Sequence, residues 1–225
     1  MSVSENLSDI KRKIPPHVRL VAVSKTKPVS DVMEAYAAGH RIFGENKAQE
    51  LITKQPELPD DIEWHFIGHL QRNKVKYMAQ FVEMIESVDS LKLLKEINKQ
   101  AVKFGRTINC LLQFHIASEE TKFGLDLGEA EEILDSEDYR VMENIRLCGV
   151  MGMATFTTDE LILRKEFSSL RMLFTTLKEK YFQQDESFRE ISMGMSGDYM
   201  IAIEEGSTNV RVGTAIFGAR TYSNQ

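Results

Sequence analysis

The sequence has few cysteines, no excess of positive charge and no long apolar run, and each shortage argues against a class of protein. Only two cysteines occur among the 225 residues, Cys110 and Cys148. Both stand in apolar, strand-like runs, which indicates buried reduced thiols rather than a disulfide or a catalytic thiol. The formal charge of −6 and the sequence pI of about 5.5 argue against a general nucleic-acid or membrane-surface binder.

Targeting and membrane-spanning segments are also missing. No apolar stretch approaches the length needed to span a bilayer, and the N-terminal segment MSVSENLSDIKRK has no apolar core of a signal peptide. We therefore expect a soluble, cytoplasmic protein without nucleic-acid or membrane partners.

No Gly/Ser linker or low-complexity segment divides the chain, so we expect residues 1–225 to form a single domain. Short apolar strands alternate with amphipathic helices along its whole length. The predicted strands are 18–24, 41–45, 64–68, 82–87, 108–116, 145–153, 189–194 and 209–217. The predicted helices are 30–38, 46–54, 73–80, 91–104, 128–136, 160–182 and 198–204.

This alternation favours an α/β protein with a single (β/α)₈ TIM barrel, and a doubly wound open sheet is the structural alternative. An extra N-terminal helix over 4–13 would cover the base or the flank of the barrel. In such a barrel, chemistry belongs at the carboxyl ends of the strands, so the residues that follow each predicted strand are the first candidates for a site.

The first strand ends on a lysine. In VRLVAVSKTKP, residues 18–28, an apolar run leads directly to Ser24 and Lys25. Lys25 could extend its ammonium group from the strand end into solvent. It could also be a Schiff-base lysine, whose pKa is lowered in a partly apolar pocket so that it supplies a neutral amine. The strand alone does not decide between these interpretations.

The last two predicted strands end in small hydroxyl and glycine residues, within SMGMSGDY (192–199) and GSTNVRVGTAIFG (206–218). Barrels commonly bind phosphate at this place, through backbone N–H groups, hydroxyls and a helix N-terminus. Ser196 could also be a plain helix N-cap. Arg211 interrupts an apolar strand, and a buried guanidinium needs an acceptor, so we predict that it points inward toward a ligand or a carboxylate.

Several other polar positions have ordinary structural interpretations. Ser30 is predicted to cap the helix that follows it, and Gly39 to end that helix in the left-handed conformation. Asn46 reads either as a helix N-cap or as a donor to a ligand oxygen. His65 and His69 have the spacing of a helical metal pair, but their segment begins as a strand, so we predict no metal site.

Seven motifs together resemble a known family. VAVSKTKP, FGENKAQE, WHFIGHLQRNK, KFGL, GVMGMA, SMGMSGDYMIAI and GSTNVRVGTAIFG occur in order between about residues 18 and 220, at the expected strand ends. They are similar to the signatures of the YggS/PROSC family of pyridoxal phosphate homeostasis proteins. One departure is Phe114-His115, where the family more often has a Val-Asn pair, and His115 is therefore left out of the expected site.

The resemblance implies a fold-type III barrel, similar to the N-terminal domain of alanine racemase. It implies pyridoxal 5′-phosphate (PLP) as the cofactor, held by Lys25 as an internal aldimine. It also implies that Arg211 faces the pyridine nitrogen and leaves it unprotonated, which weakens the electron sink. The positions that match the phosphate cradle are Ser192, Ser196, Gly213 and Thr214, and those that flank the ring are Asn46 and Ile67.

The family function is PLP homeostasis: buffering or delivery of the cofactor, with effects on amino-acid and keto-acid balance and no established reaction. The resemblance therefore assigns no catalytic residue, and it suggests PLP-dependent apoenzymes as partners. The alternative is a racemase-like PLP enzyme. The chain ends at Gln225, without the further domain that supplies the second base of alanine racemase, so we expect a two-base racemase to be incomplete. A cofactor-free Schiff-base aldolase and a protein-interaction module remain alternative functions. The sequence has no long exposed apolar stripe that would require a dimer, so we expect a monomer.

Overall fold

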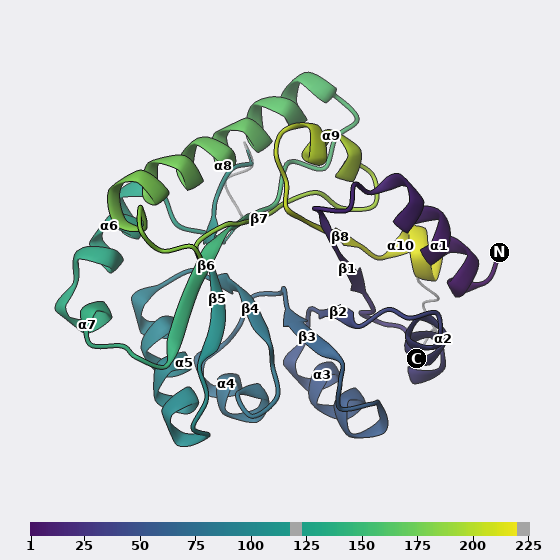
Figure 1. The fold of residues 1–225 in the computed structure, drawn as a ribbon, viewed down its shortest axis with the longest axis horizontal. Coiled ribbons are helices and arrows are strands. Elements are labelled where there is room, and N and C mark those ends of the chain that lie inside the picture. Colours follow the sequence, from purple (N-terminus) through teal and green to yellow (C-terminus); the bar gives the residue numbers. More distant parts are fainter. Residues whose placement is uncertain (118–122, 220–225) are drawn as a thin grey trace.

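The computed structural model describes residues 1–117 and 123–219, in which eight parallel strands close into a barrel (Figure 1). The strands pair in chain order and β8 pairs back with β1, where Ala22 lies opposite both Val212 and Phe43. The strands are β1 (Arg19–Val23), β2 (Ile42–Glu45), β3 (Glu63–Phe66), β4 (Met84–Val88), β5 (Ile108–Phe114), β6 (Ile145–Gly152), β7 (Glu190–Ser192) and β8 (Asn209–Val212). Closure confirms the predicted barrel over the open sheet.

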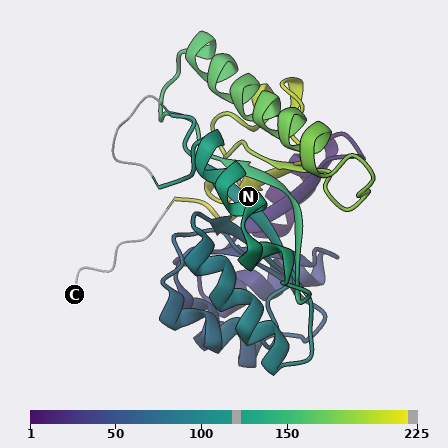
Figure 2. The same cartoon turned by 90° about the vertical axis from the view of Figure 1, so that its left-hand side faces the viewer.

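Helices surround the barrel, with α8 on the side opposite α4 and α5 (Figures 1 and 2). They are α1 (Val3–Lys13), α2 (Val29–Ala37), α3 (Ala48–Lys54), α4 (Arg72–Met78), α5 (Leu91–Lys103), α6 (Leu127–Asp135), α7 (Glu137–Arg140), α8 (Glu160–Tyr181), α9 (Tyr199–Glu204) and α10 (Thr214–Phe217), with a short 3₁₀ turn, η1, at Gln55–Glu57. The main apolar core packs the helices against the strands. A smaller apolar cluster contains Met84, Leu111, Cys148 and Met151. Within the described ranges, no helix combines the length and apolarity of a membrane span.

All eight strands occur where the sequence predicts them, but the prediction for the last one is wrong at its end. The expected strand 209–217 stops at Val212, and Thr214–Phe217 forms α10. The N–H groups of Gly213 and Ala215 donate to the Ser196 hydroxyl, 3.1 Å and 3.4 Å away, rather than to a strand ladder. The short elements η1 and α7 also have no counterpart among the predicted elements.

Of the two predicted helix caps, Ser30 is wrong and Gly39 is confirmed, and the capping interpretation of Asn46 and of Ser196 is excluded for the helix that follows each. Helix α2 begins at Val29 after Pro28, so Ser30 is inside the helix; proline already holds the φ suited to that entry. The N-caps of α3 and α9 are Lys47 and Asp198, so Asn46 and Ser196 do not cap the helices that follow them. Ser196 instead accepts from the N–H groups at the start of α10. Gly39 has φ +78°, as a left-handed helix end requires.

The N-terminal helix packs on the flank of the barrel, against α10 and α2 (Figure 1). Its start is fixed by a capping box between Ser2 and Glu5. The Asn6 amide donates to the carbonyl oxygen of Ile216 at 2.9 Å, and the Ser4 N–H donates to Glu34 at 2.9 Å. Helix α1 therefore ties the first helix of the barrel to the last.

Both cysteines are buried and free, as the sequence predicts. Burial raises the pKa of Cys148 to about 11 and raises that of Cys110 as well. Thiols with raised pKa values are poor nucleophiles, because the thiolate is the reactive form.

Candidate functional site

Lys25 follows β1 at the carboxyl end of the barrel, and its side chain is half-buried. The two residues that follow Lys25 are both anchored. Thr26 has φ +65°, the one positive φ of a non-glycine residue in the described ranges, and its N–H donates to Glu50 at 2.5 Å. The Lys27 ammonium group donates to the carbonyl oxygens of Phe217 and Ala219. An L residue in this conformation is held there by its surroundings, so the loop presents Lys25 in a preset direction.

Behind this loop lies a buried ion pair between β2 and α3. The Lys54 ammonium donates to Glu45 at 2.8 Å, to Glu50 at 2.6 Å and to the Ser24 carbonyl at 2.8 Å. The Ser24 hydroxyl donates to the same Glu45 oxygen at 2.7 Å, and the other oxygen has no hydrogen-bond partner among the described residues. Burial raises the pKa of Glu45, and the charge of Lys54 only partly offsets this. The cluster fixes the residue that precedes Lys25.

The ends of β7 and β8 meet through a serine. The Ser196 hydroxyl accepts hydrogen bonds from the N–H groups of Gly213 and Ala215, at the start of α10. A Cβ atom on Gly213 would lie 3.1 Å from the carbonyl oxygen of Val23, so this segment runs beside the end of β1. Thr214 is exposed next to it. Hydroxyl and amide donors thus gather close to the Lys25 loop, which is the composition of an anion site.

Arg211 points into the barrel, as predicted, and is 4% exposed. Its guanidinium donates to the Ser192 hydroxyl at 2.6 Å and to the carbonyl oxygen of Gly152 at 2.9 Å. The Glu86 carboxylate lies 3.9 Å away and accepts from Ser192 at 2.5 Å. Burial lowers the pKa of Arg211, while Glu86 and Asp198 act in the opposite direction. The predicted carboxylate partner is therefore Glu86.

Ser192 lies with this arginine rather than with Ser196. Its side chain is fully buried and both of its interactions are with Glu86 and Arg211. We therefore treat Ser192 as support for Arg211, and Ser196, Gly213 and Thr214 as the cradle itself, in which Thr214 is exposed and the other two are half-buried.

Asn46 and Ile67 follow β2 and β3 on the other side of Lys25. Ile67 points inward, since a Cβ atom on Gly44 would lie 3.3 Å from its Cδ1 and 2.9 Å from Val21. The carbonyl oxygen of Asn46 would lie 2.1 Å from a Cβ atom on Gly68, so only glycine fits there and the two loops are in direct contact. These residues provide one wall at the same end of the barrel.

The remaining histidine candidates are outside this arrangement or have other partners. His65 is buried, with Nδ1 2.7 Å from Glu86, whereas His69 pairs with Asp89 at 3.1 Å and stacks on Phe123. His115 is exposed. No cluster suited to a metal ion occurs in residues 1–117 and 123–219. Lys122, the first residue of the KFGL motif, lies outside the described residues.

Sequence reasoning missed Glu86, Glu45 and Lys54. A signal was present for Glu86, which interrupts the apolar segment MIESV as Arg211 interrupts its own strand. The same argument about buried charge would have predicted a partner for it. Lys54 gave no such signal, because a lysine at the end of a helix is usually solvated.

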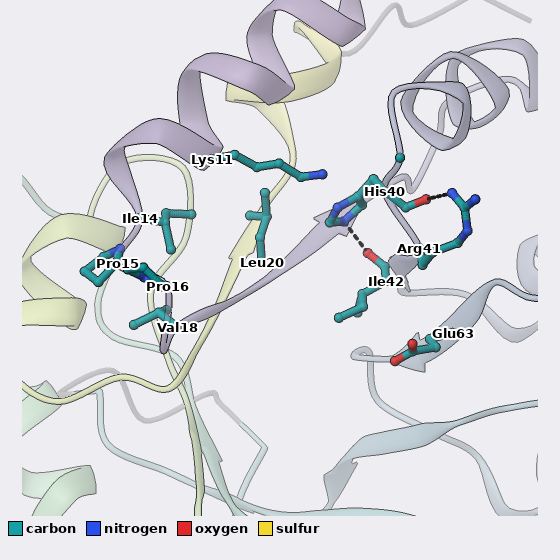
Figure 3. Close-up of a pocket in the computed structure, with 11 residues that line it drawn as sticks. Lys11, Ile14, Pro15, Pro16, Val18, Leu20, His40, Arg41, Ile42 and Glu63 are labelled. Atoms are coloured by element: carbon teal, nitrogen blue, oxygen red, sulfur yellow. Dashed lines mark hydrogen bonds between the residues drawn. The ribbon is translucent and has the colours of Figure 1, made fainter.

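A cavity of about 350 Å³ lies at the opposite end of the barrel, where β1 and β2 begin (Figure 3). Its walls include Pro15, Leu20 and Glu63, and the Lys11 side chain reaches toward His40. Arg41 also lines it and pairs with Asp61. The chemistry-bearing residues named above do not line this cavity, so we locate the candidate site by its convergent donors at the other end.

The buried His40 lines this cavity, and we expect it to make the protein less stable at low pH. Burial and the charges of Lys11 and Arg41 lower the pKa of His40 from 6.5 to about 4, although the Ile42 carbonyl favours the charged ring. Below pH 6.5 the unfolded chain binds a proton that the folded chain excludes, so stability falls as the pH approaches 4. The full loss is about 3 kcal/mol.

Urea unfolding from pH 7 to 4 should show this loss in the wild type but not in His40→Gln. The exposed His17→Gln control should follow the wild type, and parallel curves for all three would contradict the assignment.

The chain matches the family model "Alanine racemase, N-terminal domain" over residues 2–221. A protein named pyridoxal phosphate homeostasis protein, from Pasteurella multocida, is 37% identical over 239 aligned residues, which cover 99% of this chain and 100% of that protein.

Solved structures give the same picture. PipY of Synechococcus elongatus without PLP superposes with a TM-score of 0.89 at 35% identity, covering 96% of this chain and 100% of PipY. PipY with PLP bound gives 0.86 at 34% identity and the same coverage. Alanine racemase of Clostridium difficile gives 0.75 at 16% identity, with 100% of this chain matched to 57% of the racemase. At that identity the racemase shows the shared fold only.

Proposed function

This chain belongs to the alanine racemase N-terminal domain family and to the pyridoxal phosphate homeostasis proteins, and from that premise we propose that it binds PLP and takes part in PLP homeostasis. The observation that carries the proposal is the convergence of three kinds of group at one end of the barrel. These are an amine on a preset loop, a buried guanidinium, and a set of hydroxyl and amide donors.

The residues fit the three chemical parts of PLP. The phosphate suits Ser196 and the N–H groups at the start of α10, with Thr214 beside them. The aldehyde suits Lys25, which can hold it covalently. The aromatic ring suits the wall made by Asn46 and Ile67, next to Lys25.

Arg211 suits the ring nitrogen. A guanidinium only donates hydrogen bonds and stays charged, so a ring nitrogen that faces it must accept and stay unprotonated. When bound, PLP supplies an electrophilic aldehyde and an electron-withdrawing ring, and an unprotonated ring withdraws electrons less strongly. Arg211 therefore favours a site that holds the cofactor over one that activates it.

Purified protein incubated with PLP should be yellow. After borohydride reduction, peptide mass mapping should find the pyridoxyl group on Lys25. Covalent trapping makes this a test of the residue as well as of the ligand, because reduction converts the reversible link into a stable amine. A label on another lysine, or no label with PLP in excess, would contradict the site. A colourless protein that borohydride traps only with an added carbonyl compound would favour the aldolase alternative.

We further propose that the chain passes PLP to PLP-dependent apoenzymes as a cytoplasmic monomer. The two buried, free cysteines fit a reducing compartment. The racemase alternative has a direct test, which is exchange of the α-proton of alanine or serine in deuterium oxide. Exchange at enzymatic turnover would replace the homeostasis proposal with a catalytic one.

A further inference from the structure

The barrel interior contains a hydrogen-bonded network of four polar side chains: His65, Glu86, Ser192 and Arg211. Each is at most 4% exposed. Glu86 is on β4 and Ser192 is on β7, and β5 and β6 separate these strands around the barrel. Their 2.5 Å hydrogen bond must therefore cross the interior rather than follow the wall. The bond from Arg211 on β8 to Gly152 on β6 crosses it in the same way.

The donor and the acceptor of each hydrogen bond in this network follow from the chemistry of the four side chains. Arg211 can only donate, so the Ser192 oxygen accepts from it at 2.6 Å, and the Ser192 hydroxyl proton goes to Glu86. The other oxygen of Glu86 accepts from His65 Nδ1 at 2.7 Å. Both carboxylate oxygens are thus engaged, and the guanidinium plane is held by two contacts. A guanidinium has five N–H bonds, so further donors remain for a ligand.

The charges of Glu86 and Arg211 also compensate each other. Burial alone would raise the pKa of Glu86, but His65, Arg211 and Ser192 together hold it below its ordinary value, so Glu86 is a carboxylate. Its negative charge compensates Arg211 at 3.9 Å, and both side chains are buried. The half-buried Asp198 is the other acid that acts on Arg211. A buried guanidinium without a counter-charge would be strongly unfavourable.

We propose that Glu86 is a positioning residue of the cofactor site, which orients Arg211 through Ser192 before any ligand binds. Its charge also balances that of Arg211, and so sets the pH at which the Lys25-linked cofactor loses its proton. This second part rests on the proposed function. The first part concerns the protein alone.

The orientation can be tested without cofactor. In ¹⁵N NMR of the apo protein, the side-chain signals of Arg211, assigned with Arg211→Lys, should show restricted rotation of the guanidinium. Glu86→Gln and Ser192→Ala should each release it. Glu190→Gln is the matched control, because Glu190 is also a buried carboxylate of the barrel, but it pairs with Arg19 at the opposite end. Unchanged Arg211 signals in Glu86→Gln would overturn the proposal.

The charge can be tested with cofactor. A pH titration of the visible band of the PLP-loaded protein should have its midpoint lowered by about one unit in Glu86→Gln, because loss of a nearby negative charge disfavours the protonated form. Ser192→Ala, which keeps the charge, and Glu190→Gln should shift it far less. Equal midpoints in wild type and Glu86→Gln would contradict the second part.

Different measurements would contradict the proposed function and the proposal for Glu86. If the wild-type protein gave no visible band with PLP, the proposed function would fail, and the apo NMR signals would still decide the orientation. If Glu86→Gln did not fold, Glu86→Asp would take its place: it keeps the charge on a shorter side chain. The charge part then predicts a near-wild-type midpoint, and the orientation part predicts freer rotation of Arg211.

Discussion

Replacement of Lys25 by alanine should abolish covalent retention of PLP while leaving weaker, phosphate-dependent binding. The substitution removes the amine that follows β1, but none of the Ser196, Gly213 and Ala215 contacts, which join the segments after β7 and β8. We expect the affinity to fall at least about a hundredfold, which corresponds to about 2.7 kcal/mol. Fluorescence titration gives the affinity, and absorbance after gel filtration gives the retained cofactor.

Two comparisons make this result specific. Lys47→Ala removes an exposed lysine just before α3 and should retain PLP as the wild type does. In the Lys25→Ala background, pyridoxal without its phosphate should bind more weakly than PLP. Equal affinity for the two compounds would contradict the phosphate cradle, and unchanged retention of PLP by Lys25→Ala would contradict the anchor.

The barrel and the end of it that carries the site were predictable because parallel strands impose a simple rule. Each strand of a (β/α)₈ barrel runs in the same direction, so every carboxyl end reaches the same rim. Locating strand ends was therefore enough to bring Lys25, Asn46, Ile67 and Ser196 to one rim. Arg211 was predictable for a different reason: a charge inside an apolar strand must have a partner.

The partners themselves were not predictable from spacing. Glu86 and Ser192 are separated by 106 residues, and only closure of the barrel brings them together. The end of β8 was missed because Ala215, Ile216 and Phe217 continue an apolar run, whereas the N–H groups of Gly213 and Ala215 donate to Ser196. Lys54 was missed because helix position alone does not tell that a lysine faces a buried carboxylate. In each case the deciding contact is distant in sequence.

Lys54→Met should strongly destabilise the protein. It leaves the Glu45 carboxylate in a fully buried position without its cation, and breaking a buried pair costs about 3–5 kcal/mol. The same change at Lys95, whose pair with Asp138 is half-exposed, should cost at most about 1 kcal/mol. Urea unfolding measures both, and equal effects would mean that the Glu45–Lys54 pair does not behave as a buried one.

The pH dependence and a double variant show which group is responsible. Without Lys54 the pKa of Glu45 must rise further above its ordinary value, so the folded protein holds a proton that the unfolded chain releases. The deficit of Lys54→Met should therefore be small near pH 4 and grow as the pH rises toward 7. Glu45→Gln combined with Lys54→Met should recover most of the stability, because neither charge of the buried Glu45–Lys54 pair remains. It should not recover full PLP retention, because the Lys54 bond to the Ser24 carbonyl, beside Lys25, is still lost. Full recovery of both would show that the cluster stabilises the fold without positioning Lys25.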